Sequence, residues 1–295
     1  MNRNTKIILA NLGMVLATII WGFAFVVVKN SVDAVGPIYL VALRFTLASV
    51  ALGIIFFKRI KFNKKMLFQG MFLGALLFFG YATQTVGAAH TTGGKNAFLT
   101  AVYVLIVPFF MWITDKKRPD IFAVVSAFLG IIGVGIISLN GETGGINFGD
   151  ILTLICAVFY AVHMVYVEKY NKDRDAITTT FLQLSTVAVL GWILAPFYDG
   201  AFSVNVLMNS NTIIAVLYLG LLSTMLAYIL QNAAQKVVSA SNASLVLSLE
   251  SVFGAVFSAL FLPNESLSFK MVIGGVVLMF SIVMAQTKFD FLKKK

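Results

Sequence analysis

Ten apolar segments, each long enough to cross a lipid bilayer, follow one another along the chain with short polar connections. A transmembrane helix needs about 20 apolar residues, whereas a strand of a membrane barrel needs about ten residues that alternate in polarity. The segments have the helical length and show no such alternation. They occupy residues 7–28, 37–57, 67–89, 94–114, 121–139, 149–168, 178–197, 212–232, 239–262 and 269–287. The sequence therefore predicts an all-α membrane protein with ten transmembrane helices.

Composition supports the same class and argues against others. Hydrophobic residues make up 59% of the chain and charged residues 12%, whereas soluble domains contain about 25% charged residues. The net charge of +10 does not indicate nucleic-acid binding, because the basic residues form short clusters between the apolar segments, as topology signals do. The first segment is too long for a signal-peptide core and has no clear small-residue cleavage site, so we expect a retained helix.

The lysine and arginine residues are distributed unevenly between the two sides of the predicted membrane. If the ten segments cross in turn, 18 of the 22 lie on the side of the N-terminus, with clusters at 58–65, 116–118, 169–174 and in the C-terminal tail. The opposite side has only Lys29, Lys95 and Lys270. Basic residues accumulate in cytoplasmic loops. We therefore expect a multi-pass protein of the bacterial inner membrane with both termini in the cytoplasm.

Residues that support metal or nucleotide chemistry are scarce. Cys156 is the single cysteine, and the two histidines, His90 and His163, are far apart in the sequence. These residues provide no disulfide, no thiolate metal site and no His-Glu-x-x-His motif. The glycine pair before Lys95 lacks the spacing of a phosphate-binding loop. We expect no cofactor, no metal and no enzymatic activity.

Ten spans divide into two groups of five, and an odd number of spans inverts the second group in the membrane. Tyr81 and Gln84 have counterparts 147 residues later, Tyr228 and Gln231. The stretches that follow, 92–112 and 239–259, both begin with small and polar residues around an asparagine, Asn96 or Asn242. Inverted repeats are typical of secondary transporters. We predict repeats at 1–145 and 146–295, although chance similarity between apolar helices would also produce such matches.

Six short motifs, taken in their order and spacing, identify a family resemblance over nearly the whole chain. They are WGFAFVVVK at 21–29, RFTLA at 44–48, GGKNAFL at 93–99, GDILTLICA at 149–157, YLGLLSTMLAY at 218–228 and SASNASLVLSLE at 239–250. The chain resembles the EamA-domain branch of the drug/metabolite transporter superfamily. That resemblance implies two inverted repeats of five helices and a central cavity lined mainly by helices one, three, four, six, eight and nine.

The sequence departs from the family pattern at three places. Ser251 follows Glu250 where the family often has proline, which removes a possible kink near the cavity. Lys116 and Lys117 replace a Gly-Glu pair at the end of the fourth span, and Glu265 follows Pro263 and Asn264 at the end of the ninth. The last two departures lie at the membrane edge, so we expect only the backbone near Glu250 to be affected.

Two charged residues lie inside predicted spans. An ionisable group there costs about 2.5–3.5 kcal/mol on insertion scales and indicates function. Glu250, in the ninth span, is predicted to carry a coupling proton or to face a cationic substrate; the alternative is a structural pair, for example with Arg44 or with helix-end groups. Arg44, in the second span, could bind an anionic substrate. We favour a structural role for it, because such arginines snorkel or satisfy backbone carbonyls.

Polar and aromatic residues recur at helical spacing in four of the spans, the third, fourth, sixth and eighth, and Trp21 of the first span could complete the same surface. Residues three or four positions apart share a helix face, and a polar face avoids lipid. Each residue alone has an alternative role, since polar groups also join helices and tyrosines also mark the membrane interface. Together with Glu250, the predicted substrate-binding residues are Trp21, Tyr81, Gln84, Asn96, Tyr103, Tyr160, His163, Tyr228, Gln231 and Asn232.

These features predict a secondary active transporter that works by alternating access through a polar and aromatic cavity. The family resemblance implies an exporter or permease for small metabolites such as amino acids or related polar and cationic compounds, and Glu250 suggests coupling to protons. The alternatives are a membrane channel, a lipid scramblase or an intramembrane enzyme. The expected partners are a small-molecule substrate and the lipid bilayer, with no nucleic acid, and the chain is expected to act as a monomer or a homodimer.

Overall fold

The structure is a computed structural model that describes residues 3–61, 63–116, 118–138, 145–171, 174–263 and 265–287. Every regular element in these ranges is a helix, so the predicted all-α class is confirmed. Some residues that carried predictions lie outside the described residues, and those predictions stay open. They are Lys117, Lys172, Asn264 and the lysines of the C-terminal tail.

The helices account for the predicted spans. Within the described residues, nine helical segments are long and apolar enough to cross a membrane, and Phe269–Ala285 is a shorter apolar helix. The elements are α1 (Arg3–Val35), α2 (Pro37–Phe56), α3 (Lys64–His90), α4 (Gly93–Thr100), α5 (Tyr103–Asp115), α6 (Ile121–Ser138), α7 (Phe148–Asn171), α8 (Ala176–Tyr198), η2 (Val204–Met208), α9 (Ser210–Leu217), η3 (Tyr218–Leu226), α10 (Ala227–Ala234), α11 (Ala240–Leu247), α12 (Leu249–Phe261) and α13 (Phe269–Thr287).

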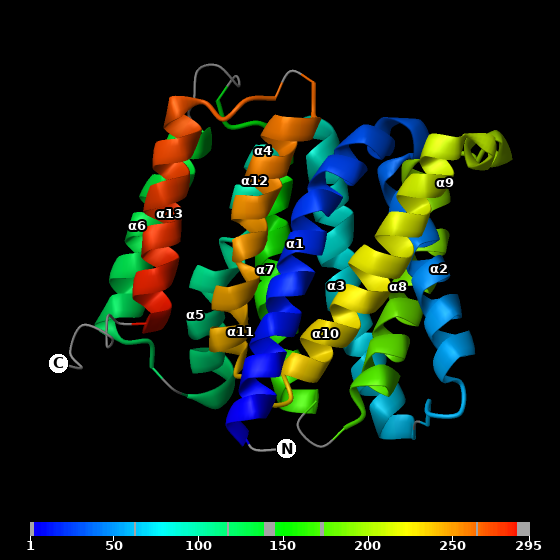
Figure 1. Cartoon of the computed structure of the whole chain (residues 1–295), viewed down its shortest axis with the longest axis horizontal. Coiled ribbons are helices and arrows are strands. Elements are labelled where there is room, and N and C mark those ends of the chain that lie inside the picture. Colours follow the sequence, from blue (N-terminus) through cyan, green and yellow to red (C-terminus); the bar gives the residue numbers. More distant parts are fainter. Residues whose placement is uncertain are drawn as a thin grey trace.

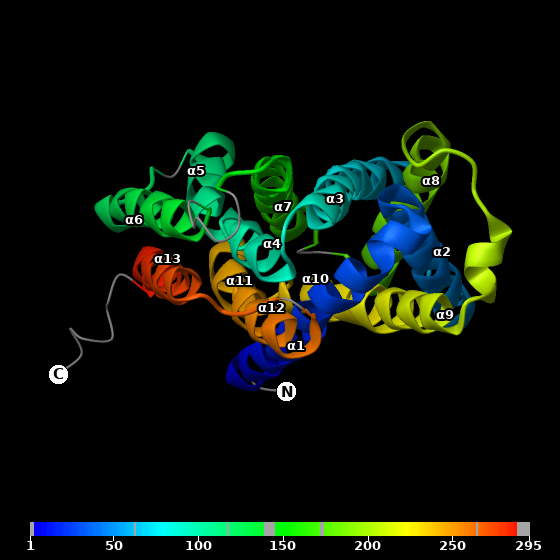
Figure 2. The same cartoon turned by 90° about the horizontal axis from the view of Figure 1, so that it is seen from above.

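The helices form an upright bundle in which α1 begins and α13 ends at the same edge (Figure 1). Seen from above, α6 and α13 lie side by side at one end and α2 and α8 at the other, with α1 and α7 between them (Figure 2). This alternation of spans agrees with the crossing pattern predicted from the basic residues. The compartment that each edge faces stays a prediction.

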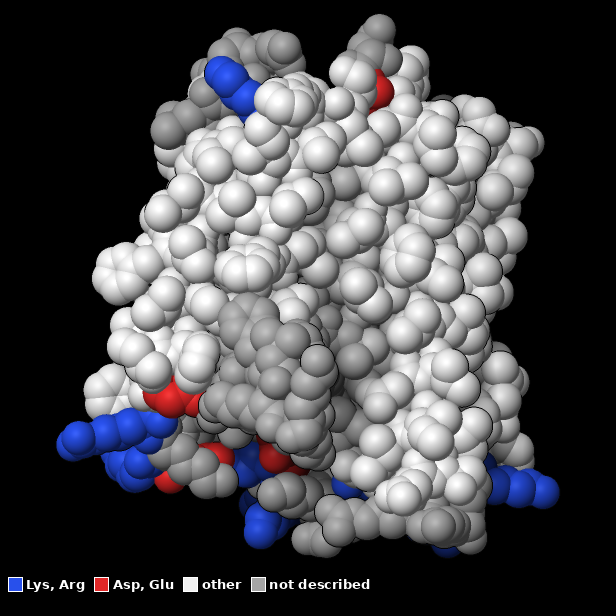
Figure 3. Space-filling view, turned by 60° about the vertical axis from the view of Figure 1, so that its left-hand side comes forward, with Lys and Arg blue, Asp and Glu red and all other residues white. Residues whose placement is uncertain are grey.

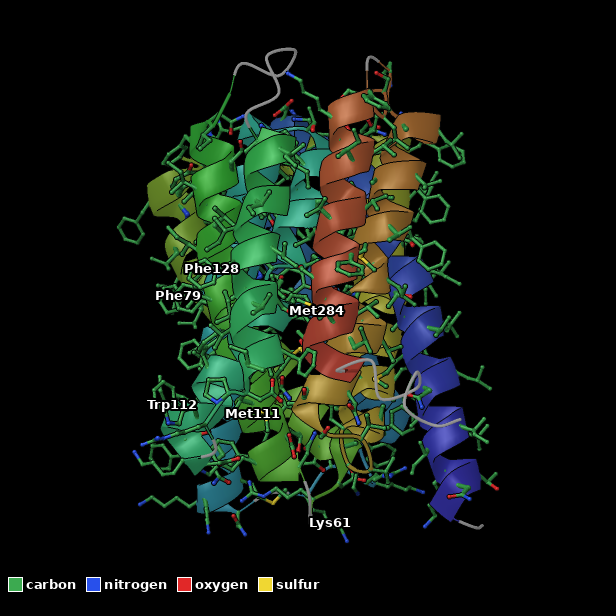
Figure 4. The ribbon with its side chains drawn as sticks, turned by 90° about the vertical axis from the view of Figure 1, so that its left-hand side faces the viewer. Lys61, Phe79, Met111, Trp112, Phe128 and Met284 are labelled. Carbon is green, nitrogen blue, oxygen red and sulfur yellow. The ribbon has the colours of Figure 1, made fainter. Side chains whose placement is uncertain are left out.

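The outer surface of the bundle is suited to lipid. Figure 3 shows an uncharged band across the molecule, with most of the visible lysine and arginine residues at one edge. Phe79, Trp112 and Phe128 lie on the outer surface in Figure 4, and all three are exposed. Lys61 marks the charged edge. Exposed apolar residues over one continuous band, with polar groups kept inside, are the arrangement that a bilayer requires.

The turn between α1 and α2 shows how sequence and distant contacts together begin a helix. Gly36 has a φ of 89°, which suits glycine, and Pro37 occupies the first turn of α2. The Asp199 carboxylate, at the end of α8, accepts the backbone N–H groups of Ile38 and Tyr39, each at 2.8 Å. First-turn N–H groups have no partner inside their own helix. Asp199 therefore both caps α2 and joins it to α8.

Close approach of α6 and α13 accounts for several glycines in these two helices. A Cβ atom on Gly133 would lie 3.0 Å from the carbonyl oxygen of Gly274, and one on Gly274 would lie 2.9 Å from that of Gly133. α6 and α13 can therefore approach only because neither residue has a side chain there. A Cβ atom on Gly130 or Gly275 would also be close to other side chains, whereas one on Gly135 would have no neighbour within 4 Å, so close packing does not account for Gly135.

Three of the predicted spans are not continuous α-helices. The fourth span is interrupted between α4 and α5, the ninth between α11 and α12, and the eighth contains the π-helix η3. The break in the ninth span lies at Ser248, so the absence of proline after Glu250 does not leave that span uninterrupted. Ser248 Oγ donates to the carbonyl of Leu245 at 2.7 Å, and Ser251 Oγ donates to that of Ser248 at 2.8 Å. Serine bonds of this kind compete with the helical backbone and bend helices.

Candidate functional site

A cavity lies at the centre of the bundle, where all three irregular spans meet. It encloses about 630 Å³ of space free of protein atoms, counting its mouth. Residues of α1, α2, α3, α4, α5, α7, η3, α10, α11 and α12 line it. The walls therefore come from the spans that the family resemblance implied, together with the second span.

The cavity gathers nearly all of the predicted substrate-binding residues. Ten of the eleven line it, and eight of these ten come from helices whose polar face was predicted to avoid lipid. They are Trp21, Tyr81, Gln84, Asn96, Tyr103, Tyr160, His163, Tyr228, Gln231 and Glu250. The pattern of polar residues in the sequence was therefore sufficient to locate the interior surface of this bundle, although their placement alone does not assign a role.

Aromatic rings form a connected wall of this cavity. The ring of Tyr228 lies 5.4 Å from that of Trp21 and 6.2 Å from that of Tyr81, measured between centroids. Tyr160 lies 5.7 Å from Tyr81 and 6.4 Å from Tyr103. These separations fall in the range of favourable aromatic pairs. The wall combines apolar ring faces with hydroxyl groups, so it suits a small molecule that has both apolar and polar parts.

Amide side chains fix a second part of the wall. Tyr160 donates its hydroxyl hydrogen to Gln84 Oε1 at 3.0 Å, and Gln84 Nε2 donates to Thr100 Oγ1 at 3.1 Å. Asn96 Nδ2 donates to Thr153 Oγ1 at 2.8 Å. The Asn96 Oδ1 atom is buried and has no hydrogen-bond partner among the described residues. Such an acceptor is costly to leave empty, and a donor group on a bound molecule would satisfy it.

Asn232 differs from the other predicted residues, because it lies outside the cavity lining. It accepts a hydrogen bond from Asn171 Nδ2 at 3.0 Å and donates its own Nδ2 to Thr180 Oγ1 at 3.0 Å. These partners lie on α7 and α8 and hold Asn232 between the helices. The alternative role of polar groups as contacts between helices describes Asn232 better than substrate binding.

His163 does line the cavity, and its Nε2 atom lies 2.7 Å from Gln183 Oε1.

Glu250 lies in the first turn of α12, directly after the break at Ser248. Its side chain is buried and interacts with that of Tyr103 across the cavity wall. A carboxylate in the first turn of a helix is stabilised by the helix dipole. Among the described residues it forms no ion pair with Arg44, since the ion pairs found there are Arg59–Asp175 and Lys95–Asp150. The structural pair with Arg44 is therefore not present among the described residues, whereas a structural role through helix-end groups stays open.

Arg44 is the cavity residue that sequence reasoning set aside. Its Nε donates to Thr224 Oγ1 at 2.9 Å and its Nη2 donates to Ser223 Oγ at 2.8 Å. The guanidinium lies 4.8 Å from the centroid of the Tyr81 ring. The hydrogen bonds shown for Arg44 go to side-chain hydroxyls, not to the backbone carbonyls that we expected. A charged residue inside a span was the available signal, but its partners on the eighth span could not be read from the sequence.

One edge of the bundle is held by charged groups around the start of α4. Lys95 and Asp150 form an ion pair of 2.7 Å, and both side chains are almost completely buried. Thr91 also donates its hydroxyl to Asp150 at 2.7 Å. Glu265, which precedes α13, accepts the backbone N–H of Gly93 at 2.8 Å. These contacts join the two halves of the chain on this side of the cavity.

The opposite edge is held by carboxylates as well. Glu168 accepts the backbone N–H of Ala240, the first residue of α11, at 2.7 Å. Asp175 caps α8 and pairs with Arg59 at 2.6 Å. Although partial burial alone would raise the pKa of Asp175, hydrogen bonds from Arg59 and from the Thr178 backbone bring it below its usual value. The cavity is thus enclosed by polar contacts at both ends.

The described residues contain no group of three or more His, Cys, Asp or Glu side chains that could hold a metal ion. What the cavity offers is a carboxylate, a guanidinium, amide groups and tyrosine hydroxyls on aromatic walls. Such an arrangement can bind and orient a small polar molecule. The cavity lies beside interrupted helices, which is a common construction of transporters.

Comparison with known proteins agrees with this architecture. The model of the EamA-like transporter family matches residues 8–139 and again residues 147–287. An uncharacterized transporter of Archaeoglobus fulgidus is 32% identical over 260 residues, which cover 87% of this chain and 79% of that protein. A Salmonella typhimurium protein named "Probable amino-acid metabolite efflux pump" is 25% identical over 228 residues, which cover 72% and 73% of the two chains.

A solved crystal structure shares the fold. It superposes with a TM-score of 0.69 and 17% sequence identity, covering 97% of this chain and 99% of the other. The family match spans most of the chain, and the relatives are named as transporters. The protein is therefore a membrane transporter rather than an enzyme, and it belongs to the EamA-like transporter family.

Proposed function

We propose that this protein is a secondary active transporter that exchanges or exports small polar metabolites, such as amino acids, through the central cavity. The observation that carries this proposal is the central cavity whose wall includes the Glu250 carboxyl and the Arg44 guanidinium, groups of opposite charge when ionised, which form no ion pair with one another among the described residues. A molecule with an amino group, a carboxylate and an apolar part would match these charges and the aromatic wall. The name of the Salmonella typhimurium relative supports the same substrate class.

Transport by alternating access requires two arrangements of the same helices around one site. We infer that residues 1–145 and 146–295 are inverted repeats that move against one another. Two observations support this inference. The broken spans have equal parts, eight and 13 residues for α4 and α5 and again for α11 and α12. α3 and the α9–α10 span also run in opposite directions through the bundle (Figure 1).

Glu250 is the group that we propose to couple transport to a driving force. It is the carboxylate among the cavity-lining residues, and it lies at a helix break, where a small movement would change its surroundings. In one state it would carry a proton, and in the other it would face the amino group of the cargo. Competition between the two for one carboxylate couples their movements across the membrane.

The orientation that we propose places the N-terminus and Asn63 in the cytoplasm of a bacterial inner membrane. Single cysteines at Asn63 and Ser203, introduced after Cys156 is replaced by serine, should react with an impermeant maleimide from opposite sides. Asn63 caps α3 at one edge and Ser203 precedes η2 at the other. Labelling of both positions from the same side would refute this topology.

The transport proposal is tested by counterflow in proteoliposomes. Vesicles loaded with an unlabelled amino acid should accumulate the same labelled amino acid transiently, because a carrier exchanges cargo one molecule at a time. Uptake should saturate and should distinguish stereoisomers. A channel or a lipid scramblase would show neither transient accumulation nor saturation, and that result would refute the proposal. Amino acids that bind in a thermal-shift screen are the first to test, since bound ligand stabilises the folded state by RT ln(1 + [L]/Kd).

A further inference from the structure

Arg44 is the charged residue of the cavity that proton coupling leaves without a role. Its side chain is only 3% exposed, although it carries a charge in the middle of the second span. A guanidinium has five N–H donors, and the two hydrogen bonds described for it reach Ser223 and Thr224. No acidic side chain among the described residues lies within ion-pair distance of it. Buried charges are normally paired, so this guanidinium is placed to receive an anion.

The hydroxyl partners of Arg44 lie in an irregular part of the eighth span. Ser223 and Thr224 belong to the π-helix η3, and the indole Nε1 of Trp21 donates to the Ser223 carbonyl at 2.7 Å. π-helical turns are rare and often occur at functional sites. Two cavity residues, Arg44 and Trp21, therefore hold the same irregular turn. A change in the hydrogen-bond partners of Arg44 would therefore act directly on η3.

We propose that Arg44 is a specificity-determining residue that binds the carboxylate of the cargo, and that this carboxylate replaces the hydroxyls of Ser223 and Thr224 on the guanidinium. The proposal rests on the transport function proposed above. A carboxylate accepts two parallel N–H bonds from arginine, and such charge-assisted bonds are about twice as strong as bonds to neutral groups. The hydroxyls are therefore the weaker ligands, which the cargo can displace.

Displacement of the two hydroxyls from Arg44 would also affect η3, the helix that carries them. When the carboxylate occupies Arg44, Ser223 and Thr224 lose the side-chain contact that links η3 to α2. The π-helix is then held by fewer bonds and can change its geometry, while the amino group of the cargo lies toward Glu250. Binding at Arg44 would in this way release the eighth span from the second. An amine without a carboxylate would fit the Glu250 end of the cavity but would leave this contact intact.

The experiment compares cargo molecules that differ only in the carboxylate. The full-length protein is screened by thermal shift and counterflow with the twenty standard L-amino acids, then with the amide and the decarboxylated amine of each amino acid that binds. On the wild type, the amino acid should bind about 10- to 100-fold more tightly than either analogue, as loss of a charge-assisted hydrogen bond predicts. Arg44→Gln should remove this preference. Arg59→Gln, which removes an arginine at the bundle edge, is the matched control and should keep it.

Two further variants separate binding from folding. Arg44→Lys keeps the charge but not the two-pronged geometry, so it should retain only part of the preference. Ser223→Ala combined with Thr224→Val removes the competing hydroxyls, and should increase affinity for the amino acid without increasing that for its amine. If Arg44 has a purely structural role, the double variant should instead weaken the binding of the amino acid, its amide and its amine equally. That result would overturn the proposal.

The remaining outcomes distinguish this inference from the transport proposal itself. Equal binding of acid, amide and amine to the wild type would overturn the role of Arg44 and leave transport through the cavity standing. Binding of amines alone would also overturn the role of Arg44 and leave transport through the cavity standing. Failure of every amino acid and every amine to bind or to exchange would overturn both proposals. Because the comparison of analogues uses the wild-type protein, it stays decisive even if Arg44→Gln does not fold.

Discussion

The two broken spans of this transporter have the same construction but carry different chemistry. Thr92 and Ser239 cap their first helices and lie 147 residues apart, and each span has a helix of eight residues followed by one of 13. At equivalent positions after the break, however, the first span has Tyr103 and the second has Glu250. The two broken spans thus share one backbone arrangement, but an ionisable carboxyl group occurs at this position only in the second. In the transport mechanism proposed above, the shared backbone shape would serve movement and the unmatched residue would serve the cargo.

The residues at the beginning of the two spans differ in the same way. Lys95 is buried in an ion pair with Asp150, whereas Asn242, 147 residues later, is exposed. The first N–H groups of α4 bind Glu265, and the first N–H of α11 binds Glu168. Among the described residues, the start of α4 is therefore held by more polar contacts than the start of α11. In an alternating-access cycle, the edge with fewer bonds is expected to open at a lower cost.

The largest expected effect comes from replacing Glu250, which has the uncharged Tyr103 as its counterpart in the first half. Glu250→Gln should leave the fold intact, because glutamine preserves shape and hydrogen bonding, and should abolish gradient-driven or cation-selective transport. Tyr103→Phe, its counterpart, should only weaken transport. The measurement is transport per folded molecule against pH, with both variants beside the wild type. If Glu250→Gln shows the pH profile and specific activity of the wild type, the functional role of Glu250 fails.

The next effect concerns the stronger edge. Lys95→Gln would leave Asp150 buried without its partner, which typically costs about 3–5 kcal/mol. Asn242→Gln, at the equivalent exposed position, should change stability by less than about 0.5 kcal/mol. Unfolding in a denaturing detergent compares the two variants. Equal losses would show that the two edges do not differ as the structure indicates.

Removal of the carboxylate caps should have smaller effects. Glu265 accepts N–H groups from both Gly93 and Gly94, at 2.8 and 3.2 Å, whereas Glu168 accepts one from Ala240. A capping contact contributes about 0.5–2 kcal/mol, so Glu265→Gln should destabilise the protein more than Glu168→Gln. The same unfolding assay measures both. The reverse order would contradict the difference between the edges.

The smallest effect is expected away from both spans. Asp175→Asn removes the ion pair with Arg59 at the bundle edge, which is worth up to about 1 kcal/mol, and should not change transport. Since the pKa of Asp175 is lower in the folded protein than its usual 3.8, its contribution is full at neutral pH and disappears as the pH falls through the folded value. The difference from the wild type should therefore vanish in acid. A difference that persists there would show that the ion pair is not its cause.

The sequence was sufficient to predict the spans and most of the cavity, because both follow from rules that act on single helices. A polar face such as that of Tyr81 and Gln84 cannot turn toward lipid, so its direction follows from spacing alone. The helix breaks and the π-helix could not be predicted in this way. An apolar segment has the same composition whether or not its helix is interrupted.

Arg44 and Asn232 show which features of the site could not be predicted from the sequence. The partners of Arg44, Ser223 and Thr224, lie about 180 residues further along the chain, and only the packing of the second span on the eighth brings them together. Asn232 shares the helical spacing of Tyr228 but is held by Asn171 and other groups between helices. Which polar residue meets the cavity and which meets a neighbouring helix is decided by tertiary contacts.

The most direct test of this account is a structure of the protein determined with a bound amino acid identified by the thermal-shift screen. The account predicts density in the central cavity, with the amino group toward Glu250, the carboxylate on Arg44 and the side chain against Tyr81 and Trp21. It also predicts that Arg44 has left Ser223. An amino acid bound outside the cavity, or one bound there with its carboxylate away from Arg44, would contradict it.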